Sequence, residues 1–228
     1  MSTPRRIPAD DATDTRVLRA AGQLFAERGF HGTTMRDIAE RAGANVASGH
    51  YHFGSKRDLY VAVLRANFAE VRGALRRGGV QIDEARLARM RPAELEALMA
   101  KRVELMLDNL LGPPPSLHGT LMMREMLDPS DALPIVVVEF IQPMIDEMAA
   151  IVRRLAPRLG EDAIFGCVCS IMGQGLFYRL TRPATLQILG LDEFTPAHLG
   201  RLASHIARFA TGGIAAVAAT PGRSRRAT

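Results

Sequence analysis

Apolar residues recur at helical spacing along almost the whole chain, and no segment of useful length alternates apolar and polar positions as a strand would. In the first helix, for example, Val17, Ala21 and Leu24 share one face. No internal repeat is found. The pattern predicts an all-α protein, with helices over 13–28, 35–42, 46–53, 56–75, 92–111, 117–127, 133–155, 161–180 and 196–217.

Glycines and capping residues divide the first third of the chain. Gly29 is placed to end the first helix, and Thr34 can cap the second with Asp37 at the third position, an acidic variant of the capping box. Gly43 ends this helix after barely two turns. Two short helices joined by a tight glycine turn are therefore expected after the first helix.

Asn45 occupies the next cap position, and the third helix can run only to residue 53 before Gly54 and Ser55 interrupt it. Ser55 in turn can cap a much longer helix. This order of helices is typical of a helix-turn-helix inside a small three-helix bundle, an arrangement that binds DNA.

The third helix has one small and polar face. Steps of about 100° per residue place Ala47, Ser48, Tyr51 and His52 on that face. A helix in the major groove needs small side chains at the base edges, as Ala47 and Ser48 provide, and donors at the phosphates, as Tyr51, His52 and Lys56 provide. Alternatively, the run HYHF packs as aromatic core and Lys56 is an ordinary solvated charge.

The distribution of charge favours the first interpretation. The 228-residue chain has a formal net charge of +5, although arginines at its two ends account for much of it. No Asp or Glu occurs between Arg41 and Arg57, the stretch that contains the third helix. A nonspecific DNA-packaging protein stays open as an alternative, and it would show strong salt dependence without sequence preference.

The segment from about Thr15 to Phe68 resembles the TetR/AcrR transcriptional regulators through LFAERGFHGTTMRDIAERAGAN and YHFGSKRDLYVAVL. The resemblance implies phosphate contacts by Thr34 and Arg36 at the start of the second helix. It also implies that Ala47 and Ser48 face the groove and that the phosphate clamps are Tyr51, His52 and Lys56. The expected DNA-binding residues are Thr34, Arg36, Asn45, Ala47, Ser48, His50, Tyr51, His52 and Lys56.

Two positions depart from that family. Gly49 stands where a large aliphatic residue is usual, and His50 where a tyrosine is frequent. Glycine should weaken the short helix by up to about 1 kcal/mol, and it removes a packing group.

The second half resembles the CecR-like (YbiH-type) branch of these regulators through REMLDPS, FIQPMIDEM and GQGLFYRLTRP. This resemblance implies a ligand-responsive repressor linked to drug efflux or membrane transport genes. Deformable apolar side chains and nearby polar groups could bind a small-molecule inducer, although each apolar one could equally fill core. The expected ligand-binding residues are Met122, Met126, Phe140, Gln174, Phe177 and Tyr178.

Two helices carry a signal for a homodimer. Small residues at 163, 166, 170 and 173 form a stripe on one helix, and the last helix has an apolar stripe at 199, 202, 206, 209 and 213. Two such helices from each subunit can build a four-helix interface, although packing within one chain would give the same pattern.

Other functions have weaker support. No G-x-S-x-G motif occurs and the Cys-x-Cys pair has no partner cluster of metal-ligand spacing, so we expect no enzymatic activity, catalytic residue, metal or cofactor. Cys167 and Cys169 are expected to be buried, reduced thiols, with an oxidation sensor as a minority hypothesis. The N-terminal arginines precede no apolar core, and the longest uncharged runs are too short or too rich in Gly and Ala to span a membrane convincingly, so a cytoplasmic location without a membrane partner is expected.

The predicted fold is an N-terminal three-helix helix-turn-helix DNA-binding domain joined by a long helix to a C-terminal helical ligand-binding and dimerisation domain. The expected divisions are a flexible basic arm over 1–12, the DNA-binding domain over 13–60, the ligand-binding and dimerisation domain over 61–217, and a disordered basic tail over 218–228.

Overall fold

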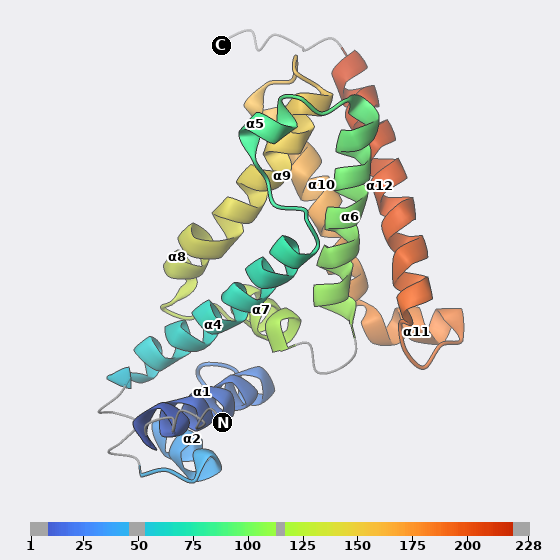
Figure 1. Ribbon diagram of the computed structural model, residues 1–228. Coiled ribbons are helices and arrows are strands. Elements are labelled where there is room, and N and C mark those ends of the chain that lie inside the picture. Colours follow the sequence, from blue (N-terminus) through green and yellow to red (C-terminus); the bar gives the residue numbers. More distant parts are fainter. Residues whose placement is uncertain (1–8, 46–52, 113–116, 221–228) are drawn as a thin grey trace, which may run out of the picture. The chain divides into compact units, whose positions relative to one another are not determined.

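The computed structural model describes residues 9–45, 53–112 and 117–220, and within these ranges it contains helices and no strand (Figure 1). The all-α prediction is confirmed. The helices are α1 (Ala9–Arg28), α2 (Met35–Ala42), α4 (Lys56–Arg77), α5 (Glu84–Leu87), α6 (Pro92–Leu111), α7 (Leu117–Leu127), α8 (Leu133–Val136), the π-helix η1 (Val137–Ile141), α9 (Gln142–Leu155), α10 (Glu161–Leu180), α11 (Arg182–Leu189) and α12 (Pro196–Ala219).

Helices α6, α7 and α10 have the bounds that the sequence predicts. Helix α1 begins at Ala9, so it takes in the last four residues of the expected N-terminal arm. The expected connection after α10 contains α11, which has a proline in its first turn and ends at Gly190 with a φ of 64°. Proline is tolerated in a first helical turn and glycine readily adopts positive φ at a helix end, so both residues suit a short helix.

The helix expected over 133–155 is interrupted by η1 between α8 and α9. Pro143 lies just beyond this π turn. A proline inside a helix removes a hydrogen bond and crowds the carbonyl four residues earlier, which here belongs to Glu139 within η1. The predicted kink is therefore a π turn, which admits an extra residue at this point.

The chain packs as two compact units. The first, here called the head unit, comprises residues 1–71 and 114–140, and the second, here called the C-terminal unit, comprises 72–113 and 141–228. Helix α7 contacts α1, so the segment from α7 to η1 shares the head unit with α1, α2 and most of α4. This division does not coincide with the expected boundary at residue 60.

Each unit has its own apolar core. In the head unit, Phe25 is fully buried and meets the edge of the Tyr60 ring, with 4.8 Å between the ring centroids. In the C-terminal unit, α6 packs against α9, α10 and α12. Its most deeply buried side chains include Met99, Val103, Leu107, Ile151, Val168, Ile171 and Ile206.

Candidate nucleic-acid interface

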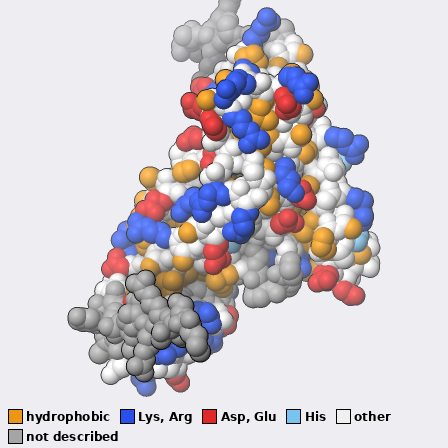
Figure 2. Space-filling model, in the orientation of Figure 1, with side chains coloured by type: hydrophobic (Ala, Val, Ile, Leu, Met, Phe, Trp, Pro, Cys, Tyr) orange, Lys and Arg blue, Asp and Glu red, His pale blue; other side chains and the backbone are white. Residues whose placement is uncertain are grey.

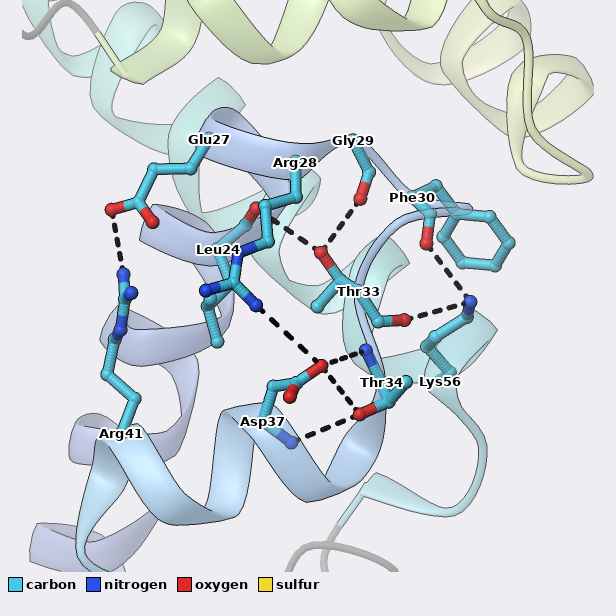
Figure 3. A network of polar contacts seen from close by, with 10 residues as sticks. All are labelled: Leu24, Glu27, Arg28, Gly29, Phe30, Thr33, Thr34, Asp37, Arg41 and Lys56. Carbon is cyan, nitrogen blue, oxygen red and sulfur yellow. Dashed lines mark hydrogen bonds and ion pairs between the residues drawn. The ribbon is translucent and has the colours of Figure 1, made fainter.

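Helix α2 begins with the predicted capping box. The Thr34 hydroxyl accepts a hydrogen bond from the Asp37 N–H at 3.1 Å, and the Asp37 carboxylate accepts one from the Thr34 N–H at 3.0 Å (Figure 3). The Thr34 hydroxyl also donates to the Asp37 carboxylate at 2.7 Å, and this hydrogen bond, followed by the one from the Thr34 backbone N–H, lowers the pKa of Asp37. The cap therefore depends on an ionised carboxylate, and α2 has a defined first residue.

The end of α2 also follows the prediction. Gly43 has a φ of 60°, and its N–H bonds back to the carbonyls of Ala39 and Glu40. An ion pair of 2.7 Å between Arg41 and Glu27 joins α2 to α1 (Figure 3). The tight turn expected between the two short helices thus starts where the sequence places it.

The segment 46–52, which holds most of the predicted third helix, lies outside the described residues. Its two flanks are described. After it, Ser55 caps α4, because its hydroxyl accepts from the Asp58 N–H and its own N–H donates to the Asp58 carboxylate. The cap predicted at Ser55 is therefore confirmed as well.

The chain between α1 and α2 is held by Thr33, a residue that the sequence did not single out. Its side chain is fully buried and its hydroxyl lies 2.8 Å from the Gly29 carbonyl oxygen and 3.2 Å from that of Leu24 (Figure 3). A hydroxyl has one proton to donate, so it bonds one of these carbonyls at a time, in the last turn of α1 or just beyond it. Thr33 thereby fixes where α2 starts relative to α1.

Lys56 occupies a different position from that of a freely solvated charge. Its Nζ lies 3.0 Å from the Phe30 carbonyl oxygen, 3.1 Å from the Thr33 carbonyl oxygen and 4.3 Å from the centroid of the Phe30 ring (Figure 3). An ammonium has three N–H groups, so these two carbonyls leave one for another acceptor. Lys56 therefore joins the first residue of α4 to the chain that leads into α2.

Helix α7 supplies the remaining contacts at the end of α1. The Arg124 guanidinium donates to the carbonyls of Ala26 and Glu27, two of the last carbonyls of α1. A cation at a helix C-terminus is favoured by the helix dipole as well as by these hydrogen bonds. Sequence reasoning missed this role, because Arg124 lies about a hundred residues away from α1 in the chain.

A buried carboxylate fixes α7 against α4. Glu125 is 1% exposed and accepts hydrogen bonds from the Tyr60 hydroxyl at 2.7 Å and from the Ser130 backbone N–H at 3.0 Å. Burial, followed by this hydrogen bond, raises the pKa of Tyr60, so the phenol is protonated and donates at physiological pH. A buried carboxylate needs such donors, because it is costly to remove from water without them.

The structure places four of the predicted DNA contacts. Thr34 and Arg36 are exposed in the first turn of α2, Asn45 is exposed beyond Gly43, and Lys56 is half-buried at the start of α4. Lys56 and Thr34 lie close together, because Lys56 bonds the carbonyl of the residue before Thr34. The other five, Ala47, Ser48, His50, Tyr51 and His52, lie outside the described residues.

The predicted ligand-binding residues fall into two groups. In the head unit, Met122 is buried, Met126 is 39% exposed, and Phe140 stacks on Phe68 with 3.8 Å between ring centroids. His118 meets both of these phenyl rings at their edges, and burial lowers its pKa to about 4. Met122 and Phe140 thus contribute to the apolar packing of the head unit.

The other three belong to α10 in the C-terminal unit. Gln174 is half-buried and its amide donates to the Ser170 carbonyl, Phe177 is 59% exposed, and Tyr178 packs against the core. Three hollows, of about 630, 470 and 540 Å³, occur in the C-terminal unit. No predicted ligand-binding residue lines any of these hollows.

The face of α10 predicted for dimerisation is exposed. Gly166 and Gly173 are exposed, and a Cβ on either would meet no other atom within 4 Å. The predicted stripe of α12 is divided, because Leu199 and Ile206 are buried within the chain whereas Phe209 is 64% exposed. By length and composition alone, both helices could span a membrane. Of the most apolar 18-residue stretch, 22% is buried in α10 and 28% in α12.

The expectation of two buried thiols is wrong for one of them. Cys167 is buried and Cys169 is exposed, because side chains two residues apart on a helix point about 200° away from each other. Burial raises the pKa of the Cys167 thiol. The exposed Cys169 shares α10 with the exposed Gly166 and Gly173.

These features define a class of protein: an all-α chain with a capped helix-turn-helix scaffold and a separate helical C-terminal unit. Two family models match it. Residues 17–63 match the N-terminal domain of bacterial regulatory proteins of the tetR family, and residues 94–214 match the C-terminal domain of the HTH-type transcriptional dual regulator CecR. The chain belongs to the TetR family and carries the CecR type of C-terminal domain.

Individual proteins show the same division. CecR of Shigella flexneri is 28% identical over 200 residues, covering 85% of this chain and 87% of that protein. The regulator RutR of Escherichia coli K12 is 44% identical over 64 residues, which span 28% of this chain and only 30% of RutR. The structure of a TetR-like regulator from Rhodococcus sp. RHA1 covers 95% of this chain and 96% of its own, with a TM-score of 0.55 at 19% identity.

The Lys56 contacts predict a loss of stability on substitution. Lys56→Met keeps the aliphatic stem but leaves the carbonyls of Phe30 and Thr33 without their charged donor, so the free energy of unfolding should fall by about 1–3 kcal/mol. Arg36→Met, the same change at an exposed position, should stay within about 0.5 kcal/mol of the parent. Urea unfolding of the three proteins measures this, and equal stability of all three would contradict the assigned role.

Proposed function

We propose that this protein is a ligand-responsive DNA-binding transcriptional regulator, acting as a dimeric repressor of transport or efflux genes. The observation that carries the proposal is the scaffold around residues 46–52. One flank is a capped helix that ends at Gly43, and the other is the Ser55 cap with Lys56 bonded back to Phe30 and Thr33. A short helix between two such fixed ends can be held rigidly enough to read a major groove.

Within this proposal, the DNA-binding residues have two kinds of role. The predicted phosphate contacts are Thr34, Arg36, Tyr51, His52 and Lys56. The other four, which face the groove or support the helix that reads the bases, are Asn45, Ala47, Ser48 and His50. The exposed position of Arg36 suits a phosphate contact. Lys56 has a structural role in addition, because two of its three N–H groups are engaged inside the head unit.

The proposed homodimer forms through α10 and the exposed part of α12. The exposed glycines of α10 would let a second backbone approach closely, and Phe165 and Phe209 provide apolar surface that is more than half exposed in one chain. Covering this surface with a second copy also accounts for two long apolar helices that are poorly buried within the chain. A cytoplasmic location follows from the proposed contact with DNA.

The proposed inducer is a bulky, mostly apolar molecule with one or two polar groups. Among the six predicted residues, Met126 of the head unit and Phe177 of the C-terminal unit are tested as separate candidate contacts. The inducer would release the repressor from a palindromic operator only if it bound the released conformation more tightly than the DNA-competent one. The coupling between operator and inducer must then be reciprocal.

A thiol-based redox regulator is the second candidate, and the exposure of Cys169 is the observation in its favour. Cys167 is a poor sensor, because burial raises its pKa and lowers its thiolate fraction. Under this alternative, replacing Cys169 by Ser would abolish an oxidant-dependent change in DNA affinity. A nonspecific DNA-binding protein is the third candidate. Selection of preferred DNA sites from a random library distinguishes it from a sequence-specific regulator.

Selection from a random duplex library should enrich a palindrome whose half-sites lie about 34–36 Å, or a multiple of that distance, apart. Enriched sites without dyad symmetry would contradict the dimer, and no enrichment would favour the nonspecific alternative.

On the selected site, Arg36→Met should lower the slope of DNA affinity against salt concentration by about one unit, whereas changes at Ser48 should alter base preference. An unchanged slope, or a preference unchanged at every base pair, would contradict the respective assignment.

Gly173→Glu should convert the dimer to a monomer, because it places a charge on the proposed interface. The isolated chain should tolerate the change, since the site is open within the chain. Ala93→Glu, at an exposed position at the start of α6, is the matched control and should stay dimeric. Sedimentation velocity measures both, and an unchanged mass for Gly173→Glu would exclude this face as the interface.

A compound found by thermal-shift screening of bulky apolar drugs should bind the protein less tightly when the selected DNA is present. Met126→Ala and Phe177→Ala should lower its affinity and leave DNA affinity unchanged, since both side chains are partly exposed and their truncation leaves little cavity. Calorimetric titration with and without DNA measures this coupling. Equal affinities in the two titrations would mean that the compound is not an inducer.

A further inference from the structure

One hollow of the C-terminal unit is separate from all the sites considered above. Its volume is about 630 Å³, within the range of about 300–1,000 Å³ that is usual for small-molecule sites. Its lining comes from the turn 78–80, from Arg86, Arg89 and Met90 in and just after α5, and from the first half of α6. Figure 2 shows Lys and Arg side chains over this part of the molecule, with Asp and Glu side chains among them.

The first wall is held firmly against α6. Gly78 approaches that helix so closely that a Cβ would lie 2.8 Å from the Leu105 Cδ1, and Gly79 has a φ of +65° that favours glycine. The Val80 carbonyl oxygen accepts a hydrogen bond of 2.7 Å from Arg102, which is only 5% exposed. A buried guanidinium thus fixes the turn that forms this wall.

The second wall is fixed in a similar way from α9. Arg154 donates to the carbonyls of Leu87 and Ala88, at 3.1 and 3.0 Å, where α5 ends. At the other end of this one-turn helix, the Asp83 carboxylate accepts from the N–H groups of Ala85 and Arg86. Both walls are therefore anchored by arginines that bond backbone carbonyls, so the hollow is preorganised.

The floor of the hollow is apolar. Val80 and Leu98 are buried, Met90 is half-buried, and Ala97 is an exposed small residue on α6. Such a floor can accept the hydrocarbon part of a ligand, and the flexible thioether of Met90 adapts to its shape.

The rim carries an excess of positive charge. Arg86, Arg89 and Lys101 line the hollow together with one acid, Glu94. Lys101 is paired with Glu104 at 2.8 Å, and Glu94 accepts from the backbone N–H of Arg91 at 2.7 Å, so the excess charge is that of Arg86 and Arg89. Arg86 and Arg89 each donate one N–H to a carbonyl, that of Gly79 and that of Ala85 respectively. A guanidinium has five N–H groups, so most of their donors are left for a ligand.

We propose that this hollow binds a small amphiphilic anion, with its phosphate or carboxylate head on Arg86 and Arg89 and its apolar tail on the α6 floor. Arginine pairs recognise such heads through charge-assisted hydrogen bonds, while the floor favours a ligand with hydrocarbon over a bare inorganic anion. The site shares no residue with the predicted inducer set, so it is independent of the proposed function.

Isothermal titration of the full chain with octyl phosphate, below its micelle concentration, tests the proposal. We expect saturable binding with one site per chain, weaker binding of inorganic phosphate, and no saturable binding of 1-octanol. Arg86→Gln combined with Arg89→Gln should weaken octyl phosphate binding by about tenfold or more. Ala97→Glu, which places an acid on the floor, should weaken it as well.

Arg158→Gln combined with Arg201→Gln removes the same charge from exposed positions elsewhere in the C-terminal unit. This control should keep the parental affinity. Equal weakening in the control, or unchanged binding in the Arg86 and Arg89 variant, would overturn the proposal. Circular dichroism and thermal melting of every variant ensure that folded proteins are compared.

A vesicle arm separates the two sources of such a head group. Co-sedimentation with phosphatidylcholine vesicles containing phosphatidic acid, if abolished by the Arg86 and Arg89 changes, would identify a membrane lipid as the ligand. Saturable octyl phosphate binding without such co-sedimentation would identify a free amphiphile. Absence of both kinds of binding would overturn the proposal.

Discussion

The head unit depends on how the carbonyl groups at the end of α1, and in the chain that follows it, find donors. A helix leaves its last carbonyls without intrahelical partners, and burying them unpaired is costly. Arg124 donates to two such carbonyls, those of Ala26 and Glu27. In the chain after α1, Thr33 bonds the Gly29 carbonyl and Lys56 bonds the Phe30 carbonyl. The end of α1 and the chain after it are therefore linked to the start of α2, the start of α4 and α7.

This arrangement changes what the segment from α7 to η1 contributes. It shares a core with α1 and α4 through Tyr60 and Glu125, and an ion pair of 2.6 Å between Arg65 and Glu139 joins it again to α4. Under the proposed function, an inducer that touches Met126 would act on a segment already packed against the DNA-binding helices. No long chain of intermediate contacts is then needed for the inducer to affect DNA binding.

The C-terminal unit presents the opposite situation, because it buries too little of two apolar helices. Cys167 and Val168 of α10 are in its core, whereas Phe165, Gly166 and Cys169 on the other side of the same helix are exposed. An apolar helix with an exposed face is stabilised in water by a partner that covers this face. The proposed second copy meets this requirement, and the small residues of α10 allow close packing.

Local interactions were predictable from the sequence alone. Thr34, Gly43 and Ser55 were correctly placed as helix caps and stops, because a cap is formed by residues within four positions of each other. The bounds of α6 and α10 follow from helical periodicity for the same reason. The π turn before Pro143 was predicted only as a kink, since the hydrogen-bond pattern of a strained turn depends on its packing.

Tertiary structure decided the contacts between distant residues. The sequence indicated DNA contact for Lys56 but not its two carbonyl partners, and it gave no sign that Arg124 caps α1 or that Glu125 is buried on Tyr60. It also suggested that both cysteines were buried, because an apolar run does not show which side of a helix meets the core. Hydrophobic pattern and capping determine which segments are helices, but the donors available to an unpaired carbonyl, and the face that stays exposed, are known only once those helices have packed.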